Sequence, residues 1–108
     1  MAPLVIRQYD VCRNKDSGSR ARIPYFVVLQ SDILSGLGTV IVAPLVLLKS
    51  APPISRLNPL IDLQGKRYSV TMQDMAGIPR SRLGTATLNV ASQHSEFIAA
   101  IDLMFSGF

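Results

Sequence analysis

The period of the hydrophobic pattern changes once along this chain, close to residue 92. Before that point the apolar residues form short segments separated by Gly and Pro, and residues 67–72 alternate between polar and apolar side chains, as in a half-buried strand. After it the apolar residues recur at steps of three and four, on one face of a predicted helix: Phe97, Ile98, Ile101, Met104 and Phe105. The sequence therefore predicts several short strands followed by one helix.

Five segments have the composition of strands, because β-branched and aromatic residues lie between turn-forming residues. They are residues 4–9, 22–30, 39–42, 60–63 and 67–72. Gly65 lies between the last two segments, so we expect it to supply the positive φ of a hairpin turn. Pro24 and Pro44 cannot donate a backbone hydrogen bond. We therefore expect an edge or a bulge at Pro24, and we expect Pro44 to end its strand or to mark an edge.

The ends of the helix are also predicted. Ser92 is the expected N-cap, Glu96 suits the positive end of the helix dipole, and Gly107 is expected to end the helix. Strands followed by one helix favour an α+β fold that is mainly β, with a small, mostly antiparallel, partly barrel-like sheet and the C-terminal helix packed on it. A chain of 108 residues has the length of one domain, so we expect a single domain over residues 1–108.

The composition indicates a folded protein with a basic surface. Hydrophobic residues make up 48% of the chain and charged residues 17%, which argues against disorder. The net charge of +4 favours either an anionic partner or only a solvated basic surface, and the scattered Lys and Arg residues fit the second interpretation. Cys12 is the single cysteine, so no intrachain disulfide is expected and a cytoplasmic location fits. The most apolar stretch, residues 37–48, is too short to span a membrane, so no membrane partner is expected.

Patterns for catalysis and metal binding are weak. The single His and the single Cys are far apart, so we expect no metal site, and no motif indicates a cofactor. The hydroxyls nearest to His94 lie on its own helix, which does not allow the usual arrangement of nucleophile, base and orienting group. We expect His94 to face solvent and Asp74 to lie in a turn. The chain is therefore not expected to be an enzyme.

The last eight residues, 101–108, are strongly apolar and end on Phe108. Chain ends are usually polar and frayed unless something holds them in place. We therefore expect this octet either to dock or to serve as a contact surface.

Three blocks of the sequence resemble the CcdB family of toxins. The first is residues 26–34, with Gln-Ser-Asp-Ile at its centre. The second is residues 57–84, with Asn-Pro-Leu near its start and Thr-Met-Gln-Asp-Met-Ala-Gly-Ile-Pro further on, and the third is the C-terminal octet. Residues 42–45 fit between the first two blocks. The blocks occur in the order of the family and the likeness covers nearly the whole chain, although it is weakest in residues 10–24 and 46–56.

The resemblance implies the toxin of a type II toxin–antitoxin module that serves plasmid maintenance. Members of this family have a CcdB/MazF-like fold and form a homodimer in which the two C-terminal helices lie together. The dimer binds the A subunit of DNA gyrase and traps the enzyme on cleaved DNA, which is not catalysis by the toxin. The contact is made by an aromatic residue third from the end, a Gly and an apolar last residue. These positions are Ser106, Gly107 and Phe108 here.

The family also implies a CcdA-like antitoxin, whose disordered acidic segment wraps the toxin and overlaps the gyrase site. The toxin–antitoxin complex represses its own operon, so contact with DNA is expected only indirectly, through the antitoxin or gyrase. A domain of charge +4 suits an acidic partner. The positions that match the antitoxin footprint are Tyr25, Val28, Ser31, Ile33, Leu34, Asp102 and Phe105.

Ser106 departs from the family pattern, because the well-known members have Trp at this position. Serine lacks the area and the ring plane of an interfacial Trp, whose truncation costs about 2 kcal/mol or more. Gyrase binding would then be weakened, lost or redirected, with Phe108 as a substitute aromatic anchor.

Two alternative functions stay open. A MazF-like toxin would cleave messenger RNA and would need basic and hydroxyl groups in one groove, for which the candidates are Arg20, Arg22, Arg67 and Thr71. A non-toxic decoy would only capture an antitoxin, and Ser106 is the residue that favours it.

Overall fold

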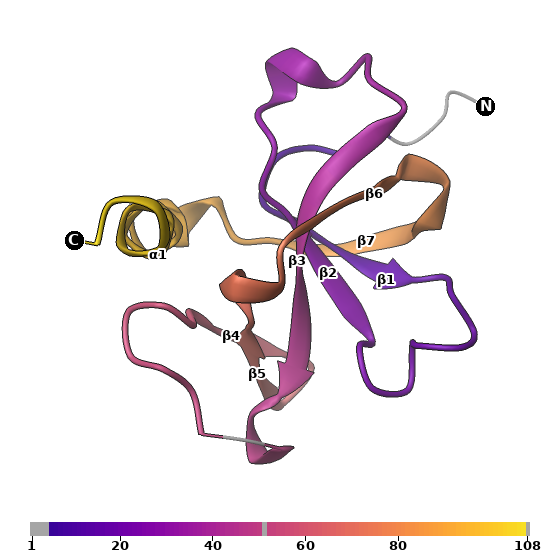
Figure 1. Cartoon of the computed structure of the whole chain (residues 1–108). Coiled ribbons are helices and arrows are strands. Elements are labelled where there is room, and N and C mark those ends of the chain that lie inside the picture. Colours follow the sequence, from indigo (N-terminus) through magenta and orange to yellow (C-terminus); the bar gives the residue numbers. More distant parts are fainter. Residues whose placement is uncertain (1–4, 51, 108) are drawn as a thin grey trace.

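The computed structural model describes residues 5–50 and 52–107. In these residues one antiparallel sheet curls into a half-barrel, and a single α-helix packs beside it (Figure 1). This is the mainly β, α+β architecture that the sequence predicts. The strands are β1 (Asp10–Asn14), β2 (Tyr25–Val28), β3 (Thr39–Leu47), β4 (Leu60–Leu63), β5 (Lys66–Val70), β6 (Ala76–Pro79) and β7 (Leu83–Asn89).

The nine-residue strand β3 is the centre of the sheet. The strand order is β4–β5–β3–β2–β1–β7, and β6 also pairs with β3. One edge of β3 pairs with β2, whereas its other edge pairs first with β6 and then with β5. The sheet therefore forks along β3, and β6 and the β4–β5 hairpin leave it in different directions (Figure 1).

Pro44 lies inside β3, so the prediction that it ends the strand or marks an edge is wrong. The edge of β3 that carries the Pro44 carbonyl pairs with β6 up to Val42 and with β5 from Leu45 onward. Between them, the Pro44 carbonyl accepts a hydrogen bond from the Thr71 backbone N–H at 3.0 Å. No strand needs a backbone donor at this gap, so a residue without an N–H fits there.

Each face of the sheet covers its own hydrophobic cluster, because successive side chains of a strand point to opposite faces. On the face beneath the helix, Val27 and Leu45 pack with Phe97. On the other face, Val28 packs in a cluster with Ile78 of β6. Burial of this second face therefore depends on the curl of the sheet and not on a helix.

The helix α1 (His94–Ser106) follows a short 3₁₀ turn. The N-cap residue is Gln93 and not Ser92 as predicted, because the 3₁₀ turn Ala91–Gln93 contains both residues and the helix begins only after it, at His94. Glu96 lies in the first turn, and Gly107 ends the helix in the left-handed conformation, with φ of 82°. Both of these predictions are confirmed. Within residues 5–50 and 52–107, no helix is long and apolar enough to cross a membrane.

The first strand begins at Asp10, so the prediction of a strand over residues 4–9 is wrong for the described residues 5–9. Residues 7–10 form a turn instead. The Arg7 backbone N–H donates to Asp10 Oδ2 at 2.8 Å, the Asp10 N–H donates back to the Arg7 carbonyl, and Tyr9 has a φ of 68°. The carboxylate of Asp10 therefore offers the backbone an alternative to a strand ladder.

The remaining strands agree with the sequence to different degrees. The β4 bounds match the prediction, whereas β2 is shorter than 22–30 and begins after Pro24, and β5 ends at Val70, before a 3₁₀ turn (Met72–Asp74) that contains Asp74. Two strands, β6 and β7, were not predicted. Neither β6 nor β7 has a clear alternation of buried and exposed residues, so their pairing partners rather than their own pattern decide their conformation.

Replacing Gly65 with Ala is expected to destabilise the fold by about 1 kcal/mol. Gln64 and Gly65 have φ values of 52° and 77° at the centre of the two-residue β4–β5 hairpin loop, and a side chain in the left-handed region is strained. No atom lies within 4 Å of a Cβ at Gly65, so backbone strain alone sets the cost. Urea unfolding would measure it. Gly77→Ala is the control, because its Cβ also meets nothing and its φ is not positive; an equal loss there would contradict the explanation.

Candidate protein-interaction surface

The helix α1 has one buried face and one exposed apolar stripe. Phe97 and Ala100 are completely buried, with Ile101 and Met104 partly buried beside them. Ile98 is 40% exposed and Phe105 70% exposed. The sequence pattern placed these aromatic and aliphatic residues on a single face, and the structure divides them between the core and the surface.

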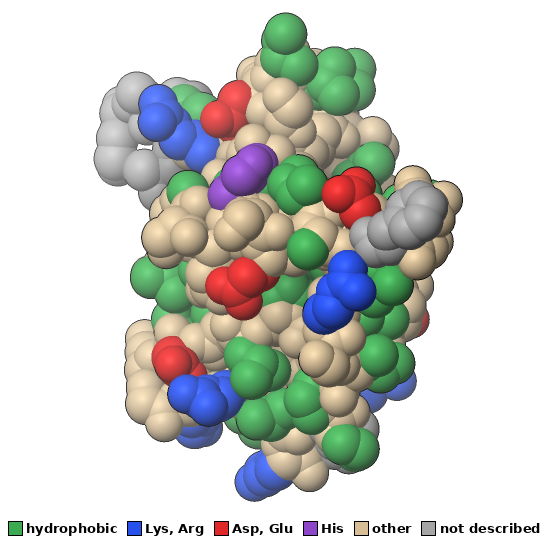
Figure 2. Space-filling view, turned by 90° about the vertical axis from the view of Figure 1, so that its left-hand side faces the viewer, with side chains coloured by type: hydrophobic (Ala, Val, Ile, Leu, Met, Phe, Trp, Pro, Cys, Tyr) green, Lys and Arg blue, Asp and Glu red, His purple; other side chains and the backbone are tan. Residues whose placement is uncertain are grey.

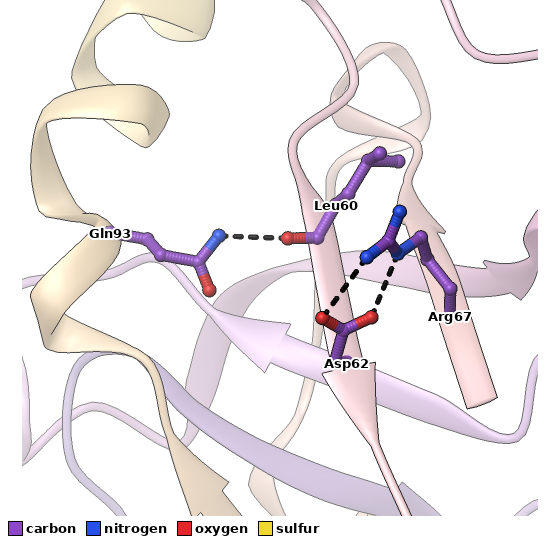
Figure 3. Close-up of polar contacts among 4 residues, drawn as sticks. All are labelled: Leu60, Asp62, Arg67 and Gln93. Atoms are coloured by element: carbon purple, nitrogen blue, oxygen red, sulfur yellow. Dashed lines mark hydrogen bonds and ion pairs between the residues drawn. The ribbon is translucent and has the colours of Figure 1, made fainter. Parts of the chain in front are cut away.

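Three contacts set the position of the start of α1 against the rest of the molecule. The Gln93 side chain donates a hydrogen bond to the Leu60 carbonyl of β4 at 2.8 Å (Figure 3). The Tyr9 hydroxyl lies 2.6 Å from His94 Nδ1, and the Tyr9 ring packs against Phe97 with centroids 5.3 Å apart. His94 is exposed as predicted, yet its ring helps to fix the helix.

The end of α1 is open to solvent. Asp102, Phe105, Ser106 and Gly107 are all exposed, and the Gly107 N–H closes the last turn by donating to the Leu103 carbonyl at 3.1 Å. The C-terminal triplet predicted to bind gyrase is therefore exposed in its first two members. Its third member, Phe108, lies outside the described residues.

A second exposed apolar region lies in the loop between β2 and β3. Ile33 is 87% exposed, and Leu34 and Leu37 are also exposed. Ser31 accepts a hydrogen bond from the Ile33 N–H through its hydroxyl, and the Arg80 guanidinium donates to the carbonyls of Leu34 and Leu37. These bonds tie the loop to the molecule while its apolar side chains stay exposed.

Both regions can be followed on the helix side of the molecule. Figure 2 shows that hydrophobic side chains gather at the top, over the β2–β3 loop, and across the middle, over α1, with charged side chains between them. We call the following exposed residues of the two regions the helix-side surface: Ser31, Ile33, Leu34, Ile98, Asp102, Phe105, Ser106 and Gly107.

Two residues of the predicted antitoxin footprint are not on the helix-side surface. Tyr25 and Val28 point into the two hydrophobic clusters and are 7% and 2% exposed. The other five predicted positions are exposed. Ile98 is a residue of this surface that sequence reasoning missed as a contact residue, because periodicity alone does not tell which face of a helix is covered.

The residues proposed for RNA cleavage do not form one groove. Arg22 and Thr71 line a cleft of about 610 Å³, whereas Arg20 lines a separate cleft. Arg67 forms an ion pair with Asp62 on the β4–β5 hairpin, with Nε to Oδ1 at 2.8 Å (Figure 3). The hydrogen bond from Arg67 holds the pKa of the Asp62 carboxyl below its ordinary value. Arg67 is thus engaged away from the other candidates.

The single thiol of the chain, Cys12, is completely buried. Burial, followed by the nearby Asp10 charge, raises the pKa of the Cys12 thiol to about 12, so this cysteine is a poor nucleophile near neutral pH. Within the described ranges, no group of three or more His, Cys, Asp or Glu side chains is placed to hold a metal ion.

A match to a protein-family model identifies the family of this chain. Residues 8–107 match the family model described as CcdB protein. The chain belongs to the CcdB family. None of the curated proteins compared with it matches the chain. Membership of this family supports a role as the toxin of a toxin–antitoxin module. It also accounts for the three sequence blocks that resemble the family.

Because the chain belongs to the CcdB family, the helix-side surface is its candidate protein-interaction surface. Ser106, which departs from the family pattern described above, is exposed at the last residue of α1. Phe105, one residue earlier, is the large aromatic side chain that the described part of this helix end exposes.

Proposed function

We propose that this CcdB-family chain is a toxin that binds the A subunit of DNA gyrase and traps its complex with cleaved DNA. The observation that carries the proposal is the exposed end of α1 in a chain of this family, where Ser106 and Gly107 lie beside the 70% exposed Phe105. The toxin acts by occupying a surface and not by catalysis. Aromatic side chains at the centre of an interface often supply much of its binding energy.

Gyrase binding is weaker than in toxins that carry Trp at the third position from the end. Ser106 presents a hydroxyl and almost no apolar area to a partner. Phe105 and Phe108 supply the aromatic contacts of this tail, with Gly107 allowing the chain to turn after the helix.

A CcdA-like antitoxin neutralises the toxin by covering the same surface. Ile33 and Leu34 from the β2–β3 loop, and Phe105 from α1, offer apolar anchors for an extended segment. The net charge of +4 attracts an acidic segment and speeds its association.

The toxin acts as a homodimer in which α1 packs beside its own copy through Ile98, which is 40% exposed. Phe105 lies two turns further along the helix and stays outside this contact, free for gyrase or the antitoxin. A two-fold axis beside Ile98 would bring both helix ends to one target.

Expression of the chain in a gyrase-containing bacterium, without an antitoxin, tests the function. We expect growth to stall and DNA breaks linked to the gyrase A subunit to accumulate, and a variant that lacks residues 106–108 to cause neither. A pull-down with a gyrase A fragment measures the contact directly. If neither the wild type nor Ser106→Trp retains the fragment, gyrase is not the target; if a mixed RNA pool is cut instead, the chain is a MazF-like nuclease.

A further inference from the structure

The charges of this chain are segregated along the sheet. Residues 13–22 and 80–82 contain six of the eleven Lys and Arg residues but only one of the seven Asp and Glu residues, Asp16. These segments are the end of β1 with the loop that follows it, and the turn between β6 and β7. Both lie on the side of the sheet away from α1 (Figure 1). The helix α1 and this basic end therefore lie on opposite sides of the sheet (Figure 1).

The basic end contains a cleft of about 460 Å³. It lies between the end of β1, the loop after it and the start of β7. Three of its lining residues are basic and none is acidic; we call these three the basic triad: Arg13, Lys15 and Arg20. Thr85 adds a polar group, and Val5 and Ile6 form an apolar part of the wall. Such a lining favours an anionic ligand.

Gly84 allows β7 to approach the triad closely. A Cβ at this position would lie 3.1 Å from Arg13 Cβ and 3.2 Å from the Arg13 carbonyl oxygen. The β1–β7 register also shifts between Cys12 and Asn14, and such irregularities redirect side chains. The Lys15 N–H donates to the Arg82 carbonyl at 3.1 Å. The backbone thus holds two of the three cations beside β7.

Asp16, the single acidic residue of these segments, accepts a side-chain hydrogen bond within its own loop. Asp16 Oδ2 accepts a hydrogen bond from the Ser19 hydroxyl at 2.7 Å, and this bond keeps the pKa of the Asp16 carboxyl below its ordinary value. The Asn14 amide donates to the Ser19 hydroxyl and to the Ile23 carbonyl, both at 2.9 Å. Asp16 faces the neighbouring cleft and does not line the one with the triad. The triad is therefore not neutralised by this carboxylate.

We propose that the basic triad binds the phosphate backbone of a nucleic-acid duplex without reading its bases. No aromatic residue lines the cleft, so it lacks the stacking platform on which single-stranded nucleic acids are held. Lys and Arg side chains that contact phosphates give affinity without sequence information. The triad lies away from the helix end, so the chain contacts DNA directly while its helix-side surface holds a protein.

Fluorescence anisotropy with a short labelled DNA duplex of arbitrary sequence tests this proposal on the purified chain alone. Three phosphate contacts predict a slope of log K against log salt of about −2.7, or a roughly 40-fold loss of affinity between about 50 and 200 mM salt. The variant Arg13→Gln/Lys15→Gln/Arg20→Gln is expected to remove most of this slope and of the binding.

The matched control is Lys49→Gln/Arg56→Gln/Lys66→Gln, which changes the net charge equally at exposed positions outside the basic end. It is expected to bind nearly as the wild type does, and thermal unfolding would show that both variants are folded. Absence of duplex binding, or equal losses in both variants, would overturn the proposal. Stronger binding to single-stranded RNA or to a Glu-rich peptide than to the duplex would overturn it as well. Because no gyrase is present, failure here is distinct from failure of the proposed function.

Discussion

Phe97→Ala is expected to lower the free energy of unfolding by about 3–5 kcal/mol, which is a large part of the stability of a small domain. The Phe97 side chain is completely buried at the centre of the cluster between α1 and the sheet, and its ring packs on Tyr9. Truncation removes this burial and leaves a cavity that the surrounding strands fill only in part. Urea unfolding monitored by circular dichroism would show a lower midpoint with an unchanged slope.

Phe105→Ala is the control for this prediction, since it makes the same chemical change two turns further along the same helix. Phe105 is 70% exposed, so its loss is expected to cost less than about 0.5 kcal/mol. Unfolding at two protein concentrations separates any contribution from self-association, because the stability of a dimer depends on concentration. Equal losses in the two variants would show that the assignment of buried and exposed helix faces is wrong.

Ser106→Trp is expected to tighten binding to a gyrase A fragment by about 30-fold, which corresponds to about 2 kcal/mol. Ser106 is exposed at the last residue of α1, so an indole ring fits there without disturbing the core. It would add a large apolar surface beside Phe105, at the place where the proposed function puts the centre of the contact. Isothermal titration calorimetry of both proteins with the fragment measures the difference.

Ser95→Trp makes a matched control, because Ser95 is exposed in the first turn of the same helix. A new indole there is expected to leave the affinity for gyrase A unchanged. Equal gains at both positions would mean that any exposed Trp adds non-specific adhesion. An unchanged affinity for Ser106→Trp, with measurable binding by the wild type, would place the contact elsewhere on the chain.

The parts of the fold that were predicted correctly depend on local interactions. The helical period, the positive φ of Gly65 and the helix end at Gly107 each follow from side chains within a few residues of one another. The CcdB resemblance, carried by three blocks in order, also came from the sequence and is confirmed by the match over residues 8–107.

The parts that were missed depend on distant partners. A strand runs through Pro44 because β5 and β6 leave a gap opposite it. Tyr25 and Val28 matched a family footprint but lie in the two cores, since the sheet is covered on both faces. No local pattern contains this information.

The sequence by itself determined that the chain is mostly strands with one terminal helix, that the helix ends at Gly107 and that the chain resembles CcdB toxins. Only the tertiary structure decided which side of that helix is covered, and so left Ile98 and Phe105 exposed. It alone placed Gly84 of β7 beside Arg13, and so formed the cleft that the basic triad lines. The physical reason is that backbone conformation follows from neighbours along the chain, whereas burial and the walls of a cleft follow from residues that only folding brings together.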